Sequence, residues 1–520
     1  MMTESANLPS LEALLTAHKA GQFAVAEQGY RKILAVNPDD LDANHLLGVL
    51  CQQTGRLMES RARLEAVLAR NPDLATAHNN LGITLQAEGD WIAAMAAYRR
   101  AIAIAPAYVE ARHNLALLAT EHEDYALAED EFRQALIAAP RMPELHLGLG
   151  NCYLHSGHLD AAMTAYQTLL EIDPDHAIGH NNIGMIFARI GQPLAALARY
   201  ERTLALDPSY AEGRWNRARL KLLIGDWEGG WTDFEARRQA PKFRKTMYHP
   251  PSPVWRGEPI AGRTLLLHAE QGRGDSIQFV RWARSIADRG ASVILDVEED
   301  LTTLFTSHDP RVTVIARSPN PPPHDLNCPL PSLPSIFAAT PANLPQPPYL
   351  LAAPERRAHW ARRLKTPPGT LKIGLVWAGN PEFVEDRQRS PRLPPFLPLL
   401  AEEGCHFFGL QVGNGRMDLA EQSMPSTFTD LGADIRDYAD TAAVMAELDL
   451  IISPCTSPAH LAGALGRPVW IALSFVADWR WMRATTESPW YPTARLYRQP
   501  SPGDWGSVIQ TMIADLKTCF

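Results

Sequence analysis

Apolar and small residues in the first half of the chain recur every 34 positions, which predicts a stack of similar helical pairs. One row consists of prolines at this constant interval: Pro38, Pro72, Pro106, Pro140, Pro174 and Pro208. A second row holds a small residue: Ala26, Ser60, Ala94, Ala128, Ala162 and Ala196. Four positions later a third row holds a large one: Tyr30, Leu64, Tyr98, Phe132, Tyr166, Tyr200 and Phe234. A period of this length is typical of units made of two helices and a turn.

Glycine marks the expected turn between the two helices of each pair. The row is Gly21, Gly55, Gly89, Gly157, Gly191 and Gly225, and Glu123 replaces glycine once. Glycine suits such a turn because it adopts a positive φ at little cost. The regular row therefore supports helical pairs of constant length.

Together these rows closely resemble the tetratricopeptide repeat (TPR) family. We count six full repeats and a seventh that ends near Arg237, and we place the repeat domain at residues 1–237. A single repeat cannot bury its apolar face alone, so the stack is the stable unit. The resemblance implies an all-α solenoid that binds a protein or peptide.

A row of asparagines in this solenoid is a candidate peptide groove. It comprises Asn80, Asn114, Asn182 and Asn216. Side-chain amides can bond the backbone of an extended peptide whatever its side chains. The row resembles the asparagine ladder of protein O-linked N-acetylglucosamine transferases, but asparagine is also common at this helix position in TPRs generally. Histidines in register nearby are more typical of packing or groove lining than of metal binding: His78, His146 and His180.

Composition narrows the functional classes. The chain has 520 residues, 46% of them hydrophobic, and a net charge of −9. An acidic chain is poorly suited to bind nucleic acid without sequence preference. We find no apolar run of membrane-spanning length and no signal-peptide pattern at the N-terminus, and the six scattered cysteines have no metal-ligand spacing. These features favour a cytoplasmic protein with no metal site.

The second half lacks the 34-residue period and divides at proline-rich segments. We expect a connector at 238–262, a first folded part at 263–352, a linker at 353–370 and a second folded part at 371–520. The segment Ser318–Pro354 contains 12 prolines, so we expect no helix in it and no central strand.

Short apolar runs in both folded parts predict buried strands. They are Thr264–His268, Ser292–Val297, Val312–Ala316, Lys372–Trp377, Cys405–Gln411, Asp449–Ser453 and Pro468–Leu473. Helical spacing is found at Asp275–Ala287, Thr441–Leu448, His460–Leu465 and Trp505–Leu516. Strands that alternate with helices predict a parallel sheet in each part. The C-terminal half is therefore expected to be α/β, with two Rossmann-like domains that face a cleft.

Three blocks resemble heptosyltransferase-type glycosyltransferases, particularly their bacterial TPR-fused relatives. They are HAEQGRGDSIQF at 268–279, GLVWAGNPEFVEDRQRS at 374–390 and LDLIISPCTSPAHLAGALGRPVW at 448–470, followed by DWRW at 478–481. The resemblance implies a GT-B fold and an inverting transfer of a sugar from a nucleotide-diphosphate donor to an acceptor hydroxyl. It implies neither a metal nor another cofactor.

In the first block, the resemblance makes Asp275 the candidate general base, which would take the proton of the acceptor hydroxyl. The alternative is that Asp275 only caps the following helix. The neighbouring Gln271, Gly272 and Gly274 are candidates for the acceptor side.

The other two blocks supply the candidate donor site. Thr456, Ser457 and His460 open a helix, whose N-terminus suits a diphosphate. Arg389, with Asn380 in the same loop, would balance the charge of the leaving diphosphate. The family usually carries aspartate where this chain has Cys455, which puts donor identity and activity in question.

Two alternatives stay open. The aromatic residues Trp479, Trp481, Trp490 and Tyr491 could line a sugar or base site or only pack in the core. The whole chain could also be a non-catalytic TPR scaffold that carries a degenerate glycosyltransferase domain.

Overall fold

The chain forms two compact units, each described by itself. The structure is a computed structural model that describes residues 10–244, 247–382 and 386–519. The division between the units lies at Ile186 and Phe187, inside helix α11 (Ala177–Arg189). Helices α12–α14 therefore group with the α/β part, although they continue the 34-residue pattern of the helices before them.

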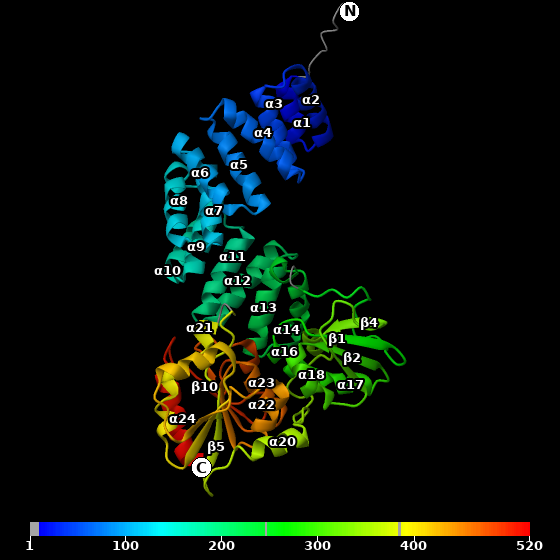
Figure 1. Ribbon diagram of the computed structural model, residues 1–520. Coiled ribbons are helices and arrows are strands. Elements are labelled where there is room, and N and C mark those ends of the chain that lie inside the picture. Colours follow the sequence, from blue (N-terminus) through cyan, green and yellow to red (C-terminus); the bar gives the residue numbers. More distant parts are fainter. Residues whose placement is uncertain (1–9, 245–246, 383–385, 520) are drawn as a thin grey trace, which may run out of the picture. The chain divides into compact units, whose positions relative to one another are not determined.

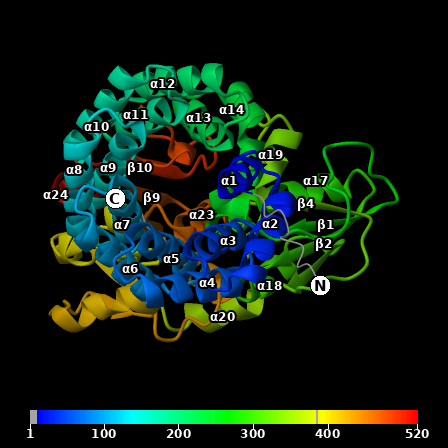
Figure 2. The same ribbon diagram turned by 90° about the horizontal axis from the view of Figure 1, so that it is seen from above.

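Unit 1 is built from antiparallel helical pairs, and Figure 2 shows them following one another in chain order along a curve. The helices are α1 (Leu11–Lys19), α2 (Phe23–Val36), α3 (Leu41–Gln53), α4 (Leu57–Arg70), α5 (Ala75–Glu88), α6 (Trp91–Ile104), α7 (Val109–Glu121), α8 (Tyr125–Ala138), α9 (Pro143–Ser156) and α10 (Leu159–Ile172). The predicted rows of small and large residues are buried at their interfaces, with Ala94 and Tyr98 both 0% exposed. The all-α repeat is thus confirmed.

The periodic prolines have a structural role that the sequence did not reveal. The carbonyl of each of five prolines accepts a hydrogen bond from the side chain six residues later. The donors are Asn44, His78, Arg112, His146 and His180, at 2.8–3.0 Å. These bonds fix the entry into the next repeat, so the three histidines are packing residues.

Glycine is favoured at the turns, because the backbone there is left-handed. All six predicted glycines have positive φ, and Gly89, Gly157 and Gly225 are the C-cap residues of their helices. Glu123 adopts the same conformation, with φ of 62°. A side chain in this region costs about 1–2 kcal/mol, so the one departure from the glycine row is a strained position.

Unit 2 begins with the end of α11 and three helices, α12 (Pro193–Leu206), α13 (Ala211–Ile224) and α14 (Trp227–Phe234). Trp227 stacks on Trp490 with ring centroids 5.1 Å apart, and Trp231 meets Trp479 edge-on at 5.5 Å. The indole of Trp231 also donates to the carbonyl of Ala339 at 2.8 Å. The last helical pair therefore shares one core with the α/β part.

The first sheet has four parallel strands in the order β3-β2-β1-β4. The strands are β1 (Thr264–His268), β2 (Ser292–Val297), β3 (Val312–Ala316) and β4 (Leu326–Pro329). The helices between them are α16 (Arg273–Phe279), α17 (Ala283–Ala287) and α18 (Glu299–Thr306), visible beside the sheet in Figure 1. The three predicted strands are confirmed within this sheet.

The second sheet has six parallel strands in the order β10-β9-β8-β5-β6-β7. They are β5 (Leu371–Leu375), β6 (Cys405–Gly409), β7 (Phe428–Asp430), β8 (Leu450–Pro454), β9 (Val469–Leu473) and β10 (Ala494–Arg498). The accompanying helices are α20 (Pro354–Ala361), α21 (Asp386–Arg389), α22 (Tyr438–Met445), α23 (Ser457–Ala464) and α24 (Trp505–Cys519). Two parallel α/β sheets thus follow the solenoid.

The structure corrects the interpretation of the proline-rich segment. We expected no helix there, but α19 (Leu333–Ile336) forms with proline in its first turn, where the missing N–H costs nothing. The segment also contains β4, which lies at the edge of its sheet. An edge strand tolerates proline because one side of it needs no hydrogen-bonding partner.

Candidate functional site

The site lies in unit 2, where α16 of the first sheet packs against α23 of the second. A β-carbon placed on Gly274 would lie 3.0 Å from Cδ2 of His460 and 3.6 Å from Cα of Ser457. The close approach of the two helices therefore requires glycine here. Gly274 therefore lies at the contact between the two α/β parts. Its place on the acceptor side stays a prediction.

Asp275 is the third residue of α16 and is held by an arginine from the other α/β part. The helix begins after Gly272, so the alternative that Asp275 is the N-cap is wrong. Its Oδ1 accepts from Nη2 of Arg480 at 2.5 Å. Arg480 also donates to Oδ1 of Asp478 at 2.8 Å and, through Nε, to Oε1 of Gln278 at 2.7 Å.

Burial and the surrounding charges set the proton affinity of this cluster. Burial raises the pKa of Asp275, Arg480 lowers it, and Asp478 and Glu270 raise it further. For Arg480, burial lowers the pKa, but Asp275 and Asp478 keep it above the usual range. A largely buried carboxylate whose pKa is raised holds a proton more readily than an exposed one, which suits a general base.

Cys455 follows β8 beside this cluster and is not set up as a nucleophile. Its Sγ accepts a hydrogen bond from the indole N–H of Trp481. Burial, with a further contribution from Asp478, raises the pKa of Cys455 to about 11. The thiol is therefore protonated at neutral pH, and the thiolate that nucleophilic attack requires is scarce.

The hydroxyl groups at the start of α23 are engaged within the protein. Thr456 is the N-cap residue but its side chain makes no capping bond, and its Oγ1 lies 3.3 Å from Oγ of Ser453. Oγ of Ser457 lies 2.6 Å from the hydroxyl of Tyr438. A ligand here would meet the backbone N–H groups of the helix start rather than free side-chain hydroxyls.

His460 is a neutral, packed side chain. Its Nδ1 lies 3.0 Å from the hydroxyl of Tyr491, and its ring stacks on Trp481 at 5.2 Å. Burial, with a further contribution from Arg480, lowers the pKa of His460 to about 3. His460 can offer a diphosphate hydrogen bonding but no positive charge.

Arg389, the last residue of α21, lies near the start of α23. A β-carbon on Gly379 would meet Oδ1 of Asp386 at 2.3 Å, Cγ2 of Thr456 at 3.0 Å and Nη2 of Arg389 at 3.1 Å. Nε of Arg389 donates to buried Asp386 at 3.1 Å, which orients the guanidinium. Asn380 from the same loop is exposed.

The remaining predicted site residues lie apart from the cluster or inside the core. Gln271 and Gly272 are exposed in the loop before α16. The aromatic residues are packed, with exposed fractions of 5% or less: Trp479, Trp481, Trp490 and Tyr491. The packing interpretation therefore holds for them, although Trp481 and Tyr491 position Cys455 and His460.

The asparagine row links neighbouring repeats. In unit 1, Asn114 donates to Oδ1 of Asn79 at 2.9 Å, and Asn182 donates to Oδ1 of Asn151 at 2.9 Å. Nδ2 of Asn80 lies 2.8 Å from Nε2 of His45, which stands one 34-residue period before Asn79. Asn216 belongs to unit 2 and is half-buried. These bonds occupy amide donors that the ladder interpretation assigned to a bound peptide.

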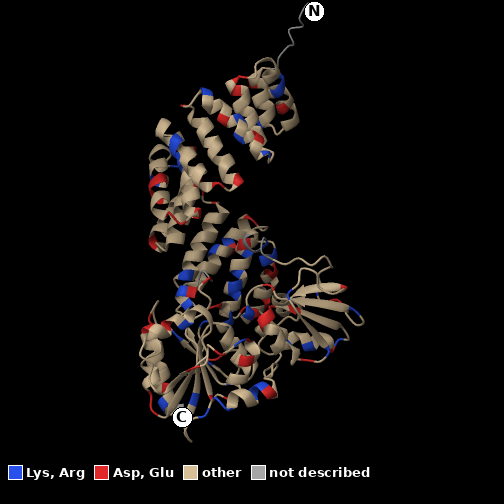
Figure 3. Cartoon of the chain, in the orientation of Figure 1, with Lys and Arg blue, Asp and Glu red and all other residues tan. Residues whose placement is uncertain are grey.

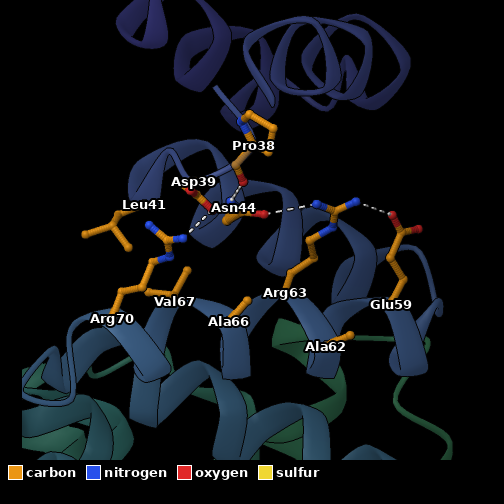
Figure 4. A pocket seen from close by; sticks show the side chains of 10 residues that line it. All are labelled: Pro38, Asp39, Leu41, Asn44, Glu59, Ala62, Arg63, Ala66, Val67 and Arg70. Atoms are coloured by element: carbon orange, nitrogen blue, oxygen red, sulfur yellow. Dashed lines mark hydrogen bonds and ion pairs between the residues drawn. The ribbon is translucent and has the colours of Figure 1, made fainter. Parts of the chain in front are cut away.

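Unit 1 also contains a cavity of about 350 Å³ between α3 and α4 (Figure 4). Its charged side chains are paired with one another or with neutral groups. Arg70 contacts Asp39 at 2.5 Å, and Arg63 donates to Oδ1 of Asn44 at 3.0 Å. The cavity therefore presents no uncompensated charge to a ligand.

A second polar pair is buried in the first sheet, where His268 and Asp296 are register neighbours on β1 and β2. Among the residues that the structure describes, no well-formed hydrogen bond reaches either ring nitrogen of His268 or either carboxylate oxygen of Asp296. Burial lowers the pKa of His268 to about 4 and raises that of Asp296 to about 6.

Comparison with known proteins supports the repeat part. Family models described as tetratricopeptide repeat match residues 39–107, 119–181 and 181–241. Protein FlbA of Caulobacter vibrioides is 29% identical over 320 residues, or 56% of this chain. The chain spans about half of that relative, 52% of its length.

Two solved structures of TPR proteins resemble part of the chain. A tetratricopeptide repeat protein from Parabacteroides merdae shares 18% identity with a TM-score of 0.40, covering 45% of this chain and 93% of its own. TTC0263, a TPR protein of Thermus thermophilus, shares 24% identity with a TM-score of 0.29, covering 33% of this chain and 94% of its own.

Two further findings concern the residues that the structure describes. No group of three or more His, Cys, Asp or Glu side chains there is arranged to hold a metal ion. In the same part of the chain, no helix is long and apolar enough to cross a membrane.

Sequence reasoning missed the residues that organise the cluster. Asp478 and Arg480 belong to the DWRW block, of which the sequence analysis names only the two tryptophans as candidate site residues. Gln278 lies on α16, one turn after Asp275. An acidic and a basic residue two positions apart within a buried aromatic segment is the signal that could have identified this pair, because buried charges are paired.

Proposed function

We propose that the C-terminal half is a GT-B-type glycosyltransferase and that the TPR array recruits a protein or peptide acceptor. The observation that carries this proposal is the place of Asp275. Its partly buried carboxylate lies at the start of α16, where that helix meets the start of α23 from the second sheet. In open α/β sheets, ligands bind outside the carboxyl ends of the strands, which is where both helices begin.

The proposed reaction is a single displacement at the anomeric carbon. The oxygen of the acceptor hydroxyl attacks that carbon while its proton passes to Asp275. The bond between the carbon and the diphosphate oxygen breaks, and its electron pair leaves with the nucleoside diphosphate. Arg389 would stabilise the charge that develops on the diphosphate, since guanidinium groups bind phosphate oxygens strongly.

The donor would bind at the N-terminus of α23. Backbone N–H groups at a helix start, together with the helix dipole, favour a diphosphate. Arg389 lies beside this turn, and Asn380 is an exposed polar group in the same loop. His460 would contribute a neutral hydrogen-bonding ring.

The TPR array would hold the acceptor protein. Residues 109–176 contain twelve Asp and Glu but only three Lys and Arg, so they alone account for the net charge of −9. Figure 3 draws Asp and Glu in red and Lys and Arg in blue. This local charge disfavours a nucleic-acid backbone as the partner of these repeats and favours a protein.

The non-catalytic scaffold is the second candidate. The protonated thiol of Cys455 and the internally bonded hydroxyls of Thr456 and Ser457 favour it. In that case unit 2 would bind no sugar nucleotide, and only the repeat array would be functional.

A nucleotide screen distinguishes the two candidates. Thermal unfolding of the full chain is followed by tryptophan fluorescence with and without UDP, GDP, ADP or CMP. A nucleotide present at 100 times its Kd stabilises the folded state by about 2.7 kcal/mol. Stabilisation by one nucleotide supports the glycosyltransferase, and no stabilisation by any of the four supports the scaffold.

A variant then tests the base. The assay measures release of the stabilising nucleotide from its sugar conjugate, with water as a minimal acceptor. Asp275→Asn should fold normally and lose activity by about 100-fold or more, the usual contribution of a general base. Asp300→Asn is the matched control. Asp300 pairs with the exposed Arg273, which lies on α16 as Asp275 does. Full activity in Asp275→Asn would refute the assignment.

A further inference from the structure

Arg480 is bound on three sides by acceptors from two segments far apart in the sequence. Its Nη2, Nη1 and Nε donate to Asp275, Asp478 and Gln278. Its guanidinium also lies over the ring of Trp479, 4.3 Å from the centroid. A planar guanidinium with three separate partners has one orientation available, so its position is fixed.

The backbone around Arg480 reinforces this position. Arg480 lies in a short 3-10 turn at Trp479–Trp481, and Oδ1 of Asp478 accepts from the backbone N–H of Arg480 at 3.0 Å. Asp478 thus caps the turn and binds the side chain that the turn presents. The indole of Trp479 packs among the aromatic residues of the last helical pair, which anchors the turn in the core.

The carboxylate of Asp275 is held at one oxygen and keeps some access to solvent. Only Oδ1 bonds to Arg480, and the side chain of Asp275 is 14% exposed. One guanidinium serves two carboxylates, so the three side chains together carry a charge of about −1. Arg480 therefore stabilises the ionised form of Asp275 without covering it.

We propose that Arg480 is a positioning residue that, held by Asp478 and Gln278, orients the carboxylate of Asp275 and keeps it ionised for proton acceptance. The inference rests on the proposed function, in which Asp275 is the base. Because Asp275 belongs to the first α/β part and Arg480 to the second, the base acquires its working orientation only when the two parts are in contact.

The other groups around Asp275 do not replace Arg480. Glu270, in the loop before α16, and Asp478 both disfavour ionisation of Asp275. His460, which approaches from α23, has a pKa lowered to about 3 and is uncharged at neutral pH. Cys455 is a protonated thiol. Arg480 is therefore the nearby cation expected to dominate the proton affinity at position 275.

The test replaces Asp275 with a thiol and measures its ionisation without any ligand. In full-length Asp275→Cys, the rate of iodoacetamide alkylation at position 275 is followed against pH by peptide mass spectrometry. An opposite charge within about 4–6 Å shifts a pKa by 1–3 units. Removing the cation with Arg480→Gln should therefore lower the alkylation rate at pH 7 by about tenfold or more.

Matched variants make the result decisive. Arg273→Gln removes a neighbouring exposed cation that binds Asp300, and it should leave the alkylation profile of Asp275→Cys unchanged. Asp478→Asn should raise the rate, because it removes an opposing negative charge. If Arg480→Gln alone fails to fold, the comparison is made in the Asp478→Asn background, where the buried charge is balanced, and adding Arg480→Gln should again lower the alkylation rate.

The alkylation results test the role of Arg480 separately from the proposed glycosyltransferase function. A profile that is the same with and without Arg480, or that responds equally to Arg273, overturns it while leaving Asp275 as the proposed base. A shift specific to Arg480 supports it even if no nucleotide binds, in which case the proposed function fails separately. Where turnover is measurable, Arg480→Lys should move the acidic limb of the kcat/KM profile to higher pH.

Discussion

Loss of Arg237 should destabilise unit 2 by about 4 kcal/mol, because it would leave the buried carboxylate of Glu270 without its partner. Arg237 is fully buried in the turn after α14 and binds both oxygens of Glu270, at 2.7 and 2.8 Å. It also contacts Glu235 at 2.6 Å and Ser332 at 2.8 Å. Burial lowers the pKa of Arg237, but the two glutamates keep it above the usual range.

The magnitude follows from the exposure of each partner. The side chain of Glu270 is 3% exposed, whereas that of Glu235 is 40% exposed. In Arg237→Met, water replaces the contact of Glu235 but cannot reach Glu270. Breaking a buried pair in this way costs about 3–5 kcal/mol. Glu270→Gln should cost only about 1–2 kcal/mol, since Arg237 keeps Glu235 and Ser332.

Urea denaturation at pH 7, followed by tryptophan fluorescence, measures the effect in the intact chain. All tryptophans except Trp91 lie in unit 2, so the signal reports on that unit. Arg237→Met combined with Glu270→Leu should recover most of the loss, because removal of a whole buried pair is often nearly neutral. A cost below about 1 kcal/mol for Arg237→Met alone would refute the reasoning.

Three further predictions concern single side chains. Glu123→Gly should stabilise unit 1 by about 1 kcal/mol, measured by urea denaturation with circular dichroism, because it removes the strain of a positive φ. Asp296→Asn should make the free energy of unfolding fall more steeply from pH 6 to pH 4, by about 1.4 kcal/mol more for each pH unit. Unfolding experiments at a series of pH values measure this slope. In this window Asp296 gains a proton in the folded state and His268 in the unfolded state, so their effects now oppose each other. Gly274→Ala should cost about 1–3 kcal/mol by the fluorescence assay, since its β-carbon would press on His460.

Each of these predictions has a matched control. Gly89→Glu should lose about what Glu123→Gly gains, since both positions have positive φ; no difference at either would contradict the strain argument. His268→Phe should flatten the acid loss of stability, and an unchanged slope in Asp296→Asn would show that the two groups do not titrate as described. Gly272→Ala should be neutral, because a β-carbon there meets nothing within 4 Å.

The repeat array could be predicted from the sequence because each structural requirement recurs at a fixed spacing. A turn that needs positive φ selects glycine six times, and a close helical contact selects alanine or serine six times. The strands β1, β2 and β3 were also readable, since buried parallel strands are continuous apolar runs. β7 was missed because it has three residues, all half-buried, and so lacks such a run.

The site was only partly readable. Asp275 and Arg389 stand in motifs, and the structure brings each to the start of a helix or its neighbouring loop. The bond from Arg480 to Asp275 joins residues 205 positions apart, and no local pattern encodes such a contact. The neutral state of His460 was equally hidden, because it depends on burial against Trp481 and Tyr491.

The shared tryptophan core of the last helical pair has a consequence for recombination of such genes. A recombination crossover at residue 237, where the repeat pattern ends, would separate Trp227 and Trp231 from the aromatic partners that they contact in the α/β part. A crossover near Gly191, in the turn before α12, would leave that core intact. We therefore expect that repeats upstream of α12 can be exchanged without disturbing this core, whereas α12–α14 must accompany the two sheets.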